Sequence, residues 1–236
     1  MPAMPDQFFA TTRWTEVRAA GESAGDALES LCTAYWFPIH GYVRRHGFSK
    51  EDAEDLTQAF FAKLIERRDF ADLKKENGRF RAFLLAALKH FLANERDRAG
   101  RLKRGGRITH LSLDLQSADE RFQIADAAQI PPDAAYDREW AVTLLERVVV
   151  RLGEEFAADG KAERFEHMKP FLTLGKGEIP YATAAEALSI DEGTVRVAVH
   201  RMRKRYRQLL REEIAYTLSD PAMIEEELAV LLGAFR

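Results

Sequence analysis

The chain has 236 residues, of which 46% are hydrophobic and 31% are charged. This length suits two small domains or one large one, and the hydrophobic share is enough to form a core. The one cysteine, Cys32, excludes a disulfide framework and a multi-cysteine zinc site. No apolar run approaches the roughly 20 residues of a membrane span, and residues 1–14 lack the pattern of a signal peptide. We therefore expect a cytoplasmic protein without a membrane span.

The small net charge of −3 conceals two strongly basic stretches. Residues 74–107 contain 11 basic and three acidic side chains, and residues 193–211 contain seven basic and no acidic side chains. The segments 108–137 and 212–236 each carry a net charge of −5. Basic clusters are typical of proteins that bind a polyanion, although solvated helix faces give the same pattern.

Apolar residues recur at helical spacing through most of the chain, which predicts an all-α fold. In the first half, the spacing predicts helices over residues 28–42, 53–65 and 80–104. Pro38 is expected to kink or interrupt the first of these helices, and Gly47 to follow its end. Ser49, with an acidic residue three positions later, resembles a capping box at the start of the second helix.

The helical period fails between residues 108 and 137, where polar and acidic residues and a Pro-Pro pair predict a linker. It returns near Trp140, and further helices are expected over residues 163–174, 181–188 and 192–210. Pro170 is expected to disturb the first of these three. Asp220 and Pro221 are typical of the cap and first turn of a last helix, whose expected buried face comprises Ile224, Leu228, Leu231, Leu232 and Phe235.

These elements predict two small helical domains joined by a linker. The first domain covers residues 1–107, the acidic linker 108–137 and the second domain 138–211. An acidic helical extension, residues 212–236, follows the second domain.

The segment 181–211 carries the most specific pattern in the chain. A helix-turn-helix needs a small residue where its helices touch, a tight turn four residues later, and an aliphatic residue that locks the second helix onto the first. Ala185, Ser189 and Val195 occupy these places, although glycine is usually favoured at the turn. Asp191 is placed to cap the second helix.

The second helix of this motif has an apolar stripe that packs inward and a basic stripe beside it. A hydroxyl at Thr194 and the start of the helix are placed to bind a phosphate. The arginines around His200 make a metal site there unfavourable. The residues that we expect to contact DNA are Thr194, Arg196, His200, Arg201, Arg203, Lys204 and Arg207.

The first basic stretch interleaves aromatic rings with arginine and lysine. This composition suits unstacked bases, because rings stack on them and cations hold the backbone. The spacing of Phe80 and Phe83 fits the core of a helix equally well. The candidate nucleic-acid contacts are Lys75, Asn77, Arg79, Phe80, Phe83, Lys89, His90, Asn94 and Arg98.

Three motifs together resemble the extracytoplasmic-function sigma factors, the small two-domain branch of the bacterial sigma family. Residues 53–61, AEDLTQAFF, are similar to the helix of that family that binds core polymerase. Residues 80–98 are similar to its promoter-melting and minus-ten segment, and residues 194–205 to its minus-thirty-five helix. The acidic linker lies where the family has its own.

The resemblance implies a sigma factor that directs RNA polymerase to promoters, with sigma region 2-like and region 4-like domains. It implies no cofactor, metal or catalytic residue, and an anti-sigma protein is a further candidate partner. The first basic stretch would capture the minus-ten strand with a flipped base, and the second would read the minus-thirty-five duplex. The implied contacts with the beta-prime clamp of the polymerase are Asp52, Asp55, Leu56, Gln58 and Phe61.

The chain departs from the family pattern at Ala59, where an acid is usual, and at His90 and Asn94, which replace a common asparagine and aspartate. The minus-ten preference is therefore expected to be unusual. The acidic extension 212–236 is expected either to shield the basic helix of the second domain or to pack on that domain.

Three alternatives remain. An enzyme is disfavoured because the sequence has no HExxH, G-x-S-x-G, P-loop or dinucleotide fingerprint. A helix-turn-helix regulator that does not engage core polymerase would use the same second domain. A helical adaptor would need no nucleic acid at all.

Overall fold

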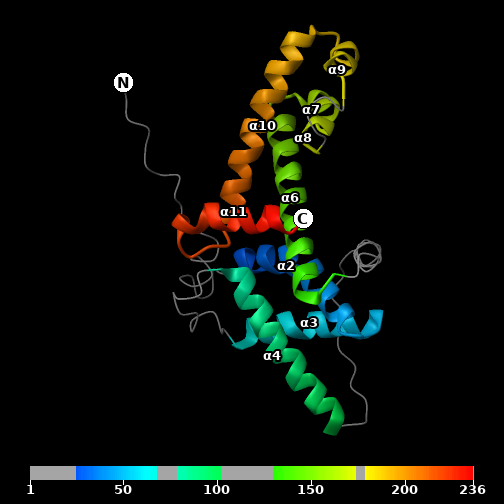
Figure 1. The fold of residues 1–236 in the computed structure, drawn as a ribbon, viewed down its shortest axis with the longest axis vertical. Helices are drawn as coiled ribbons and strands as arrows, with labels where there is room; N and C mark the ends of the chain where they lie inside the picture. Colours follow the sequence, from blue (N-terminus) through cyan, green and yellow to red (C-terminus); the bar gives the residue numbers. More distant parts are fainter. Residues whose placement is uncertain (1–24, 68–78, 102–129, 174–178, 236) are drawn as a thin grey trace. The chain divides into compact units, whose positions relative to one another are not determined.

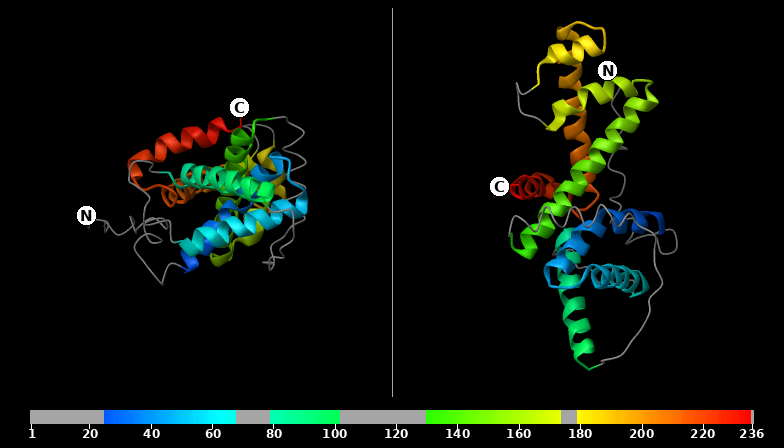
Figure 2. Two further views of the ribbon diagram at one scale, coloured as in Figure 1. Left: turned by 90° about the horizontal axis from the view of Figure 1, so that it is seen from below. Right: turned by 90° about the vertical axis from the view of Figure 1, so that its right-hand side faces the viewer.

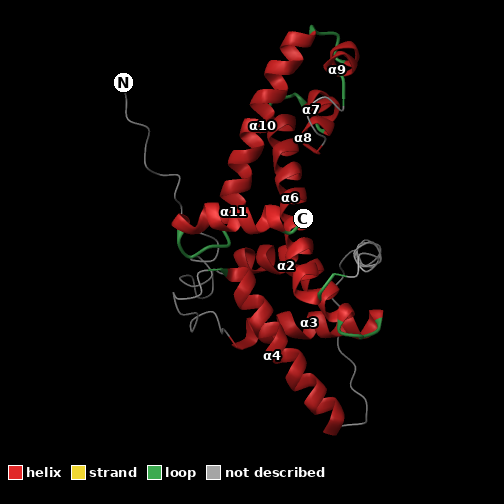
Figure 3. Ribbon diagram, viewed as in Figure 1, coloured by secondary structure: helices red, strands yellow, loops and turns green. Residues whose placement is uncertain are grey.

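The computed structural model describes residues 25–67, 79–101, 130–173 and 179–235 (Figure 1). These residues are predominantly helical, and none of them forms an extended sheet strand (Figure 3). The predicted all-α class is confirmed. Within the same ranges, no helix combines the length and the hydropathy needed to cross a membrane.

The chain separates into two compact units. Unit 1 takes residues up to Thr143 and again from Ile214 to the end, and unit 2 takes Leu144–Glu213. Both boundaries fall inside continuous helices, α6 (Pro132–Ala158) and α10 (Glu192–Ala215). Each of these two helices therefore contributes residues to both units.

The start of α6 corrects the expected linker. Residues 132–137 are helical, and the side chain of Tyr136 is fully buried. Pro132 stands at the first helical position, where its fixed φ angle and missing N–H are tolerated. The Pro-Pro pair therefore marks a helix start and not, as the sequence predicts, a part of the linker. The rest of the expected linker, up to residue 129, lies outside the described residues.

Unit 1 begins with α2 (Gly25–Arg45), α3 (Lys50–Arg67) and α4 (Phe80–Arg101). The expected interruption is absent, because α2 runs on through Pro38. Gly47 follows its end with a φ of +86°, a left-handed conformation that glycine adopts without strain. The Ser49 cap is confirmed, since its hydroxyl accepts a hydrogen bond from the Asp52 amide at 3.1 Å.

Aromatic side chains join the first three helices of unit 1. The rings of Tyr35 on α2 and Phe80 on α4 meet edge to face, with centroids 5.2 Å apart. The α3 ring of Phe60 contacts Phe91 of α4 at 5.6 Å. Apolar residues of the same helices complete this core, among them Ile39, Val43, Leu64, Leu84 and Leu88.

The C-terminal segment of unit 1 contains the short helix η3 (Pro221–Met223) and α11 (Ile224–Gly233). The predicted Asp220 cap is confirmed, since its carboxylate accepts a hydrogen bond from the Ala222 amide at 2.9 Å. The predicted apolar face is wrong in part. Leu231 is buried, but Leu232 and Phe235 are 60% and 45% exposed, and Glu227 is fully buried.

This segment also corrects the expected role of the extension. Residues from Ile214 onward cluster with unit 1 and not with the helix-turn-helix unit. Within this extension, Glu226 and Glu227 pair with Arg79 and Arg81 of unit 1. Glu212, by contrast, pairs with Arg205 of the basic part of α10 and with Arg151 of α6.

Unit 2 combines parts of α6 and α10 with α7 (Ala162–Met168), α8 (Pro170–Thr173) and α9 (Tyr181–Ala187). The single helix predicted over 163–174 is divided, because Pro170 starts a new helix. The parts of α6 and α10 in this unit cross in the right-hand view of Figure 2, and Glu155 of α6 pairs with Arg205 of α10. Its core contains Val148, Leu152, Phe165, Met168, Phe171, Val199, Met202 and Leu209.

Candidate nucleic-acid interface

Helices α9 and α10 form the predicted helix-turn-helix. Ala185 is 8% exposed and Val195 is fully buried, as the contact between the two helices requires. Ser189 has a φ of +52°, so the turn has the left-handed residue that the motif needs. A residue with a Cβ atom adopts this conformation at a cost, which explains why glycine is usually favoured there.

Asp191 caps α10, as predicted. Its carboxylate accepts hydrogen bonds from the amide of Thr194, at 2.8 Å, and from the hydroxyl of the same residue. The hydrogen bond from the Thr194 hydroxyl is the largest cause of the lowered pKa of Asp191. Because the Thr194 hydroxyl donates its proton to this cap, the expected phosphate contact from that hydroxyl is not available in this structure.

Five of the predicted DNA contacts on α10 are exposed cations or an exposed imidazole. One of them, Arg196, is held in place by neighbours. Its Nη2 atom lies 2.6 Å from Oε1 of Glu192, and its guanidinium lies 5.4 Å from the centre of the Tyr181 ring. The five exposed side chains are Arg196, His200, Arg201, Lys204 and Arg207.

Arg203 is half-buried and differs from these exposed residues, because its guanidinium is bound within unit 2. Its Nε and Nη2 atoms donate to the carbonyl oxygen of Phe171 at 2.9 and 2.6 Å. The side chain therefore satisfies a carbonyl at the end of the short helix α8. Helical spacing alone cannot separate Arg203 from the cations beside it.

Arg205 is likewise turned toward unit 2 rather than outward. Its Nε and Nη2 atoms bind the two carboxylate oxygens of Glu155 at 2.8 and 2.6 Å, a bidentate pair. The hydrogen bonds from Arg205 hold the pKa of Glu155 below its usual range. This pair joins α10 to α6 within unit 2.

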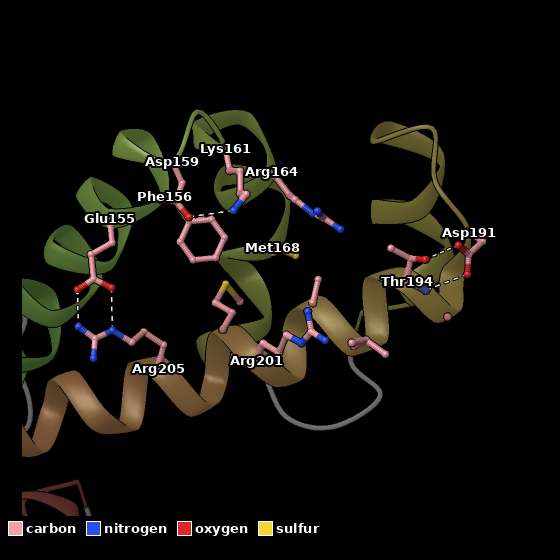
Figure 4. A pocket seen from close by; sticks show the side chains of 14 residues that line it. Glu155, Phe156, Asp159, Lys161, Arg164, Met168, Asp191, Thr194, Arg201 and Arg205 are labelled. Carbon is pink, nitrogen blue, oxygen red and sulfur yellow. Dashed lines mark hydrogen bonds and ion pairs between the residues drawn. The ribbon is translucent and has the colours of Figure 1, made fainter. Parts of the chain in front are cut away.

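A groove of about 710 Å³ borders the first half of α10 (Figure 4). Its apolar lining includes Phe156 and the two methionines Met168 and Met202, and its cations include Arg164 of α7 and Arg201 of α10. Arg164 was not predicted as a site residue. Its position in the sequence does not indicate that α7 lies next to the exposed cations of α10. The groove places a second helix of unit 2 next to that face.

The described part of the first basic stretch, residues 79–101, is only partly exposed. Phe80 is 2% exposed and packs on Tyr35, so its ring belongs to the core of unit 1 in this structure, the alternative that its helical spacing also fitted. Phe83 is half-buried, and Arg79 is paired with Glu226 and Glu227. The predicted contacts Lys75 and Asn77 lie outside the described residues.

Further along α4, the predicted contacts are exposed. Lys89 forms an ion pair with Asp133 at 2.7 Å, and Arg98 forms one with Glu95 at 3.4 Å. The four exposed predicted contacts are Lys89, His90, Asn94 and Arg98. Ion pairs at such exposed positions are weak and can be exchanged for phosphate contacts.

The five predicted polymerase contacts on α3 divide into two groups. Asp52 is exposed, and Asp55 and Leu56 are half-buried, so these three reach the surface of unit 1. Gln58 and Phe61 are each 6% exposed, and the Phe61 ring stacks on Trp36. Gln58 and Phe61 therefore lie on the inner side of the helix, and little of either side chain is accessible to a partner in this structure.

A charged cluster that sequence analysis missed lies at the start of α4. Arg81 is 7% exposed, donates to Glu227 and Asp137, and lies 4.9 Å from the centre of the Trp140 ring. Burial alone would lower the pKa of Arg81, but the carboxylates of Glu227 and Asp137 outweigh it and raise that pKa. Burial raises the pKa of Asp137, against the opposing effect of the Arg81 guanidinium.

Within the described ranges, no three His, Cys, Asp or Glu side chains are placed to hold a metal ion. Comparisons of the chain with family models, with curated proteins and with solved structures found no match.

Proposed function

We propose that this protein binds promoter DNA and directs RNA polymerase to it, as a sigma factor of the extracytoplasmic-function kind. The observation that carries the proposal is the helix-turn-helix of α9 and α10 with cations exposed along α10. A helix of this type enters the major groove, where arginine reads guanine and lysine holds phosphates.

The exposed cations of α10 predict how strongly DNA binding should depend on salt. Each phosphate neutralised by a cation lowers log K by about 0.9 per unit of log salt. The exposed cations Arg196, Arg201, Lys204 and Arg207 therefore predict a steep salt dependence. No acidic residue interrupts the sequence 193–211, and carboxylates from outside it pair with Arg196 and Arg205, so the favourable potential for DNA rests mainly on the remaining exposed cations.

The proposed polymerase contact is the exposed side of α3, with Asp52, Asp55 and Leu56. The proposed contact with the minus-ten strand is the exposed side of α4, with Lys89, His90, Asn94 and Arg98. Both surfaces belong to unit 1, and both are narrower than the resemblance implies, because Phe80, Gln58 and Phe61 are buried.

The second candidate is a DNA-binding regulator that does not engage core polymerase. The burial of two of the five expected polymerase contacts favours it. The two proposals share the duplex contact of α10 and differ in whether unit 1 binds polymerase.

The test measures both properties on the full chain. Fluorescence anisotropy with promoter-length duplexes should show binding that weakens in Arg207→Ala, whereas Lys169→Ala, which removes an exposed cation of unit 2 outside α10, should bind as the parent does. Pull-down of core polymerase should succeed with the parent and weaken in Asp55→Ala. Duplex binding without polymerase binding would support the regulator. An absence of duplex binding would contradict both the sigma-factor proposal and the regulator proposal.

A further inference from the structure

The C-terminal segment of unit 1 is joined to the start of α4 through the backbone. The amide of Phe80 donates a hydrogen bond of 3.0 Å to the carbonyl oxygen of Thr217. Arg79 and Leu218 form an isolated antiparallel bridge, and Leu218 is fully buried. After the turn at Asp220, α11 lies beside the start of α4 (Figures 1 and 2).

The same segment supplies carboxylates to both arginines at this place. Oε2 of Glu226 lies 2.7 Å from Nη2 of Arg79, and Oε2 of Glu227 lies 3.2 Å from Nε of Arg79. Oε1 of Glu227 accepts a hydrogen bond of 3.1 Å from Nε of Arg81. Carboxylates in the first turn of α11 therefore bind the guanidinium groups of Arg79 and Arg81. The phosphates of a nucleic acid would bind the same groups with the same charge.

The contact is of a kind that can be exchanged. Glu226 is 66% exposed, and an exposed ion pair contributes little to stability. Nε of Arg79 has no hydrogen bond of good geometry in the described structure, although Glu227 lies within ion-pair distance. A phosphate can therefore replace the exposed carboxylate of Glu226 at a small net change in free energy, whereas Glu227 is fully buried and holds the segment more firmly.

We propose that residues 214–235 form an acidic clasp that occupies the start of α4 and must be displaced before that place binds single-stranded nucleic acid. This inference rests on the proposed function, because it takes Arg79 as a contact of the nucleic-acid backbone in the open state. The apparent association constant for the strand equals that of the open state multiplied by the fraction of molecules that are open, so a mostly closed clasp weakens binding. In the closed state the Phe80 ring stays in the core of unit 1.

The first test weakens the clasp without removing any proposed DNA contact. Binding of a fluorescein-labelled adenine- and thymine-rich single strand is measured by anisotropy for the parent, Glu226→Gln and the double variant Glu226→Gln with Glu227→Gln. The double variant should bind at least tenfold more tightly than the parent, and Glu226→Gln, whose exposed site leaves the fold intact, about threefold. The control Glu186→Gln removes one exposed negative charge of unit 2 and should change the affinity less than twofold.

The second test locks the clasp. Bridge partners in an antiparallel pair have Cα atoms at a spacing that a disulfide spans. A chain with Arg79→Cys and Leu218→Cys, in a Cys32→Ser background, should bind the strand several-fold more weakly when oxidised than when reduced. Because both forms have the same sequence, the loss of the Arg79 cation cancels in the comparison.

The outcomes separate the clasp from the proposed function. Tighter binding by the double variant and weaker binding by the oxidised chain support the clasp. Equal single-strand binding by all variants, or no such binding by any of them, overturns it. Duplex binding by α10 and polymerase pull-down are measured on the same proteins, so the clasp can fail while the proposed function stands.

Discussion

Nε of Arg81 donates a hydrogen bond of 3.1 Å to Oε1 of Glu227, although 146 positions separate the two residues in the chain. Glu227 is fully buried and Arg81 is 7% exposed. A buried carboxylate is tolerated only where a cation and hydrogen bonds compensate it. This pair therefore ties the last helix to unit 1.

Glu227→Ala should lower the free energy of unfolding of unit 1 by about 3 kcal/mol, because it leaves the Arg81 guanidinium buried with less compensation. Urea unfolding followed by tryptophan fluorescence measures this, since Trp36 and Trp140 both belong to unit 1. The neighbouring Glu226→Ala is the matched control. Its exposed ion pair should contribute less than about 1 kcal/mol, and equal losses in the two variants would contradict the assignment of Glu227 to the core.

Arg203 and Arg207 lie on one helix and should respond differently to truncation. Arg203→Ala should destabilise unit 2 by about 1–2 kcal/mol, because the Phe171 carbonyl loses both of its donors from Arg203. Arg207→Ala should leave stability within about 0.5 kcal/mol and reduce the salt slope of duplex binding by about 0.9. Thermal unfolding and salt-dependent anisotropy measure the two effects. The reverse pattern would show that Arg203 faces DNA.

Ser189→Gly should stabilise the helix-turn-helix. The φ of +52° at this position is strained for a residue with a Cβ atom, and glycine removes that strain. Glycine loses more conformational entropy on folding than serine, which offsets part of this gain. The free energy of unfolding should therefore rise by about 0.5–1 kcal/mol. Ser189→Ala, which keeps the Cβ atom, should show no gain. The two variants are compared by thermal unfolding monitored by circular dichroism.

The pair of Glu155 and Arg205 predicts a pH dependence for unit 2. Because the folded-state pKa of Glu155 lies below its ordinary value of 4.5, its stabilising contribution is complete above that value. The contribution is lost as the pH falls through the lowered pKa. Both side chains are about one-third exposed, so the contribution should be below about 1 kcal/mol.

Glu155→Gln tests this pH dependence. The variant should unfold at a lower urea concentration than the parent at pH 6, and the difference should shrink steadily as the pH is lowered toward 2. A difference that does not change with pH would assign the effect to packing rather than to the charge of Glu155.

The helix-turn-helix could be predicted from local signals. Ala185, Ser189, Asp191 and Val195 each have a role within a few residues of chain, and the structure gives each the expected burial, dihedral angle or cap. The Ser49 and Asp220 caps were predictable for the same reason. A cap involves its own helix end and depends little on the rest of the fold.

The side that each residue faces was harder to predict. Arg203 and Arg207 are both basic residues of one helix, and a carbonyl on α8 determines which of them turns inward. Glu227 lies among three consecutive glutamates, and no local feature indicates that this one is buried against α4. Contacts over such long sequence separations leave no periodic signal, so the C-terminal helix was expected beside the wrong part of the chain.

Run-off transcription with core RNA polymerase, the full chain and a genomic library as template tests the central claim most directly. The account predicts discrete transcripts that require the chain, begin downstream of a shared sequence, and are strongly reduced by Lys204→Ala with Arg207→Ala but not by Lys169→Ala. Transcription that is the same with and without the chain, under conditions where the chain is folded, would contradict the account.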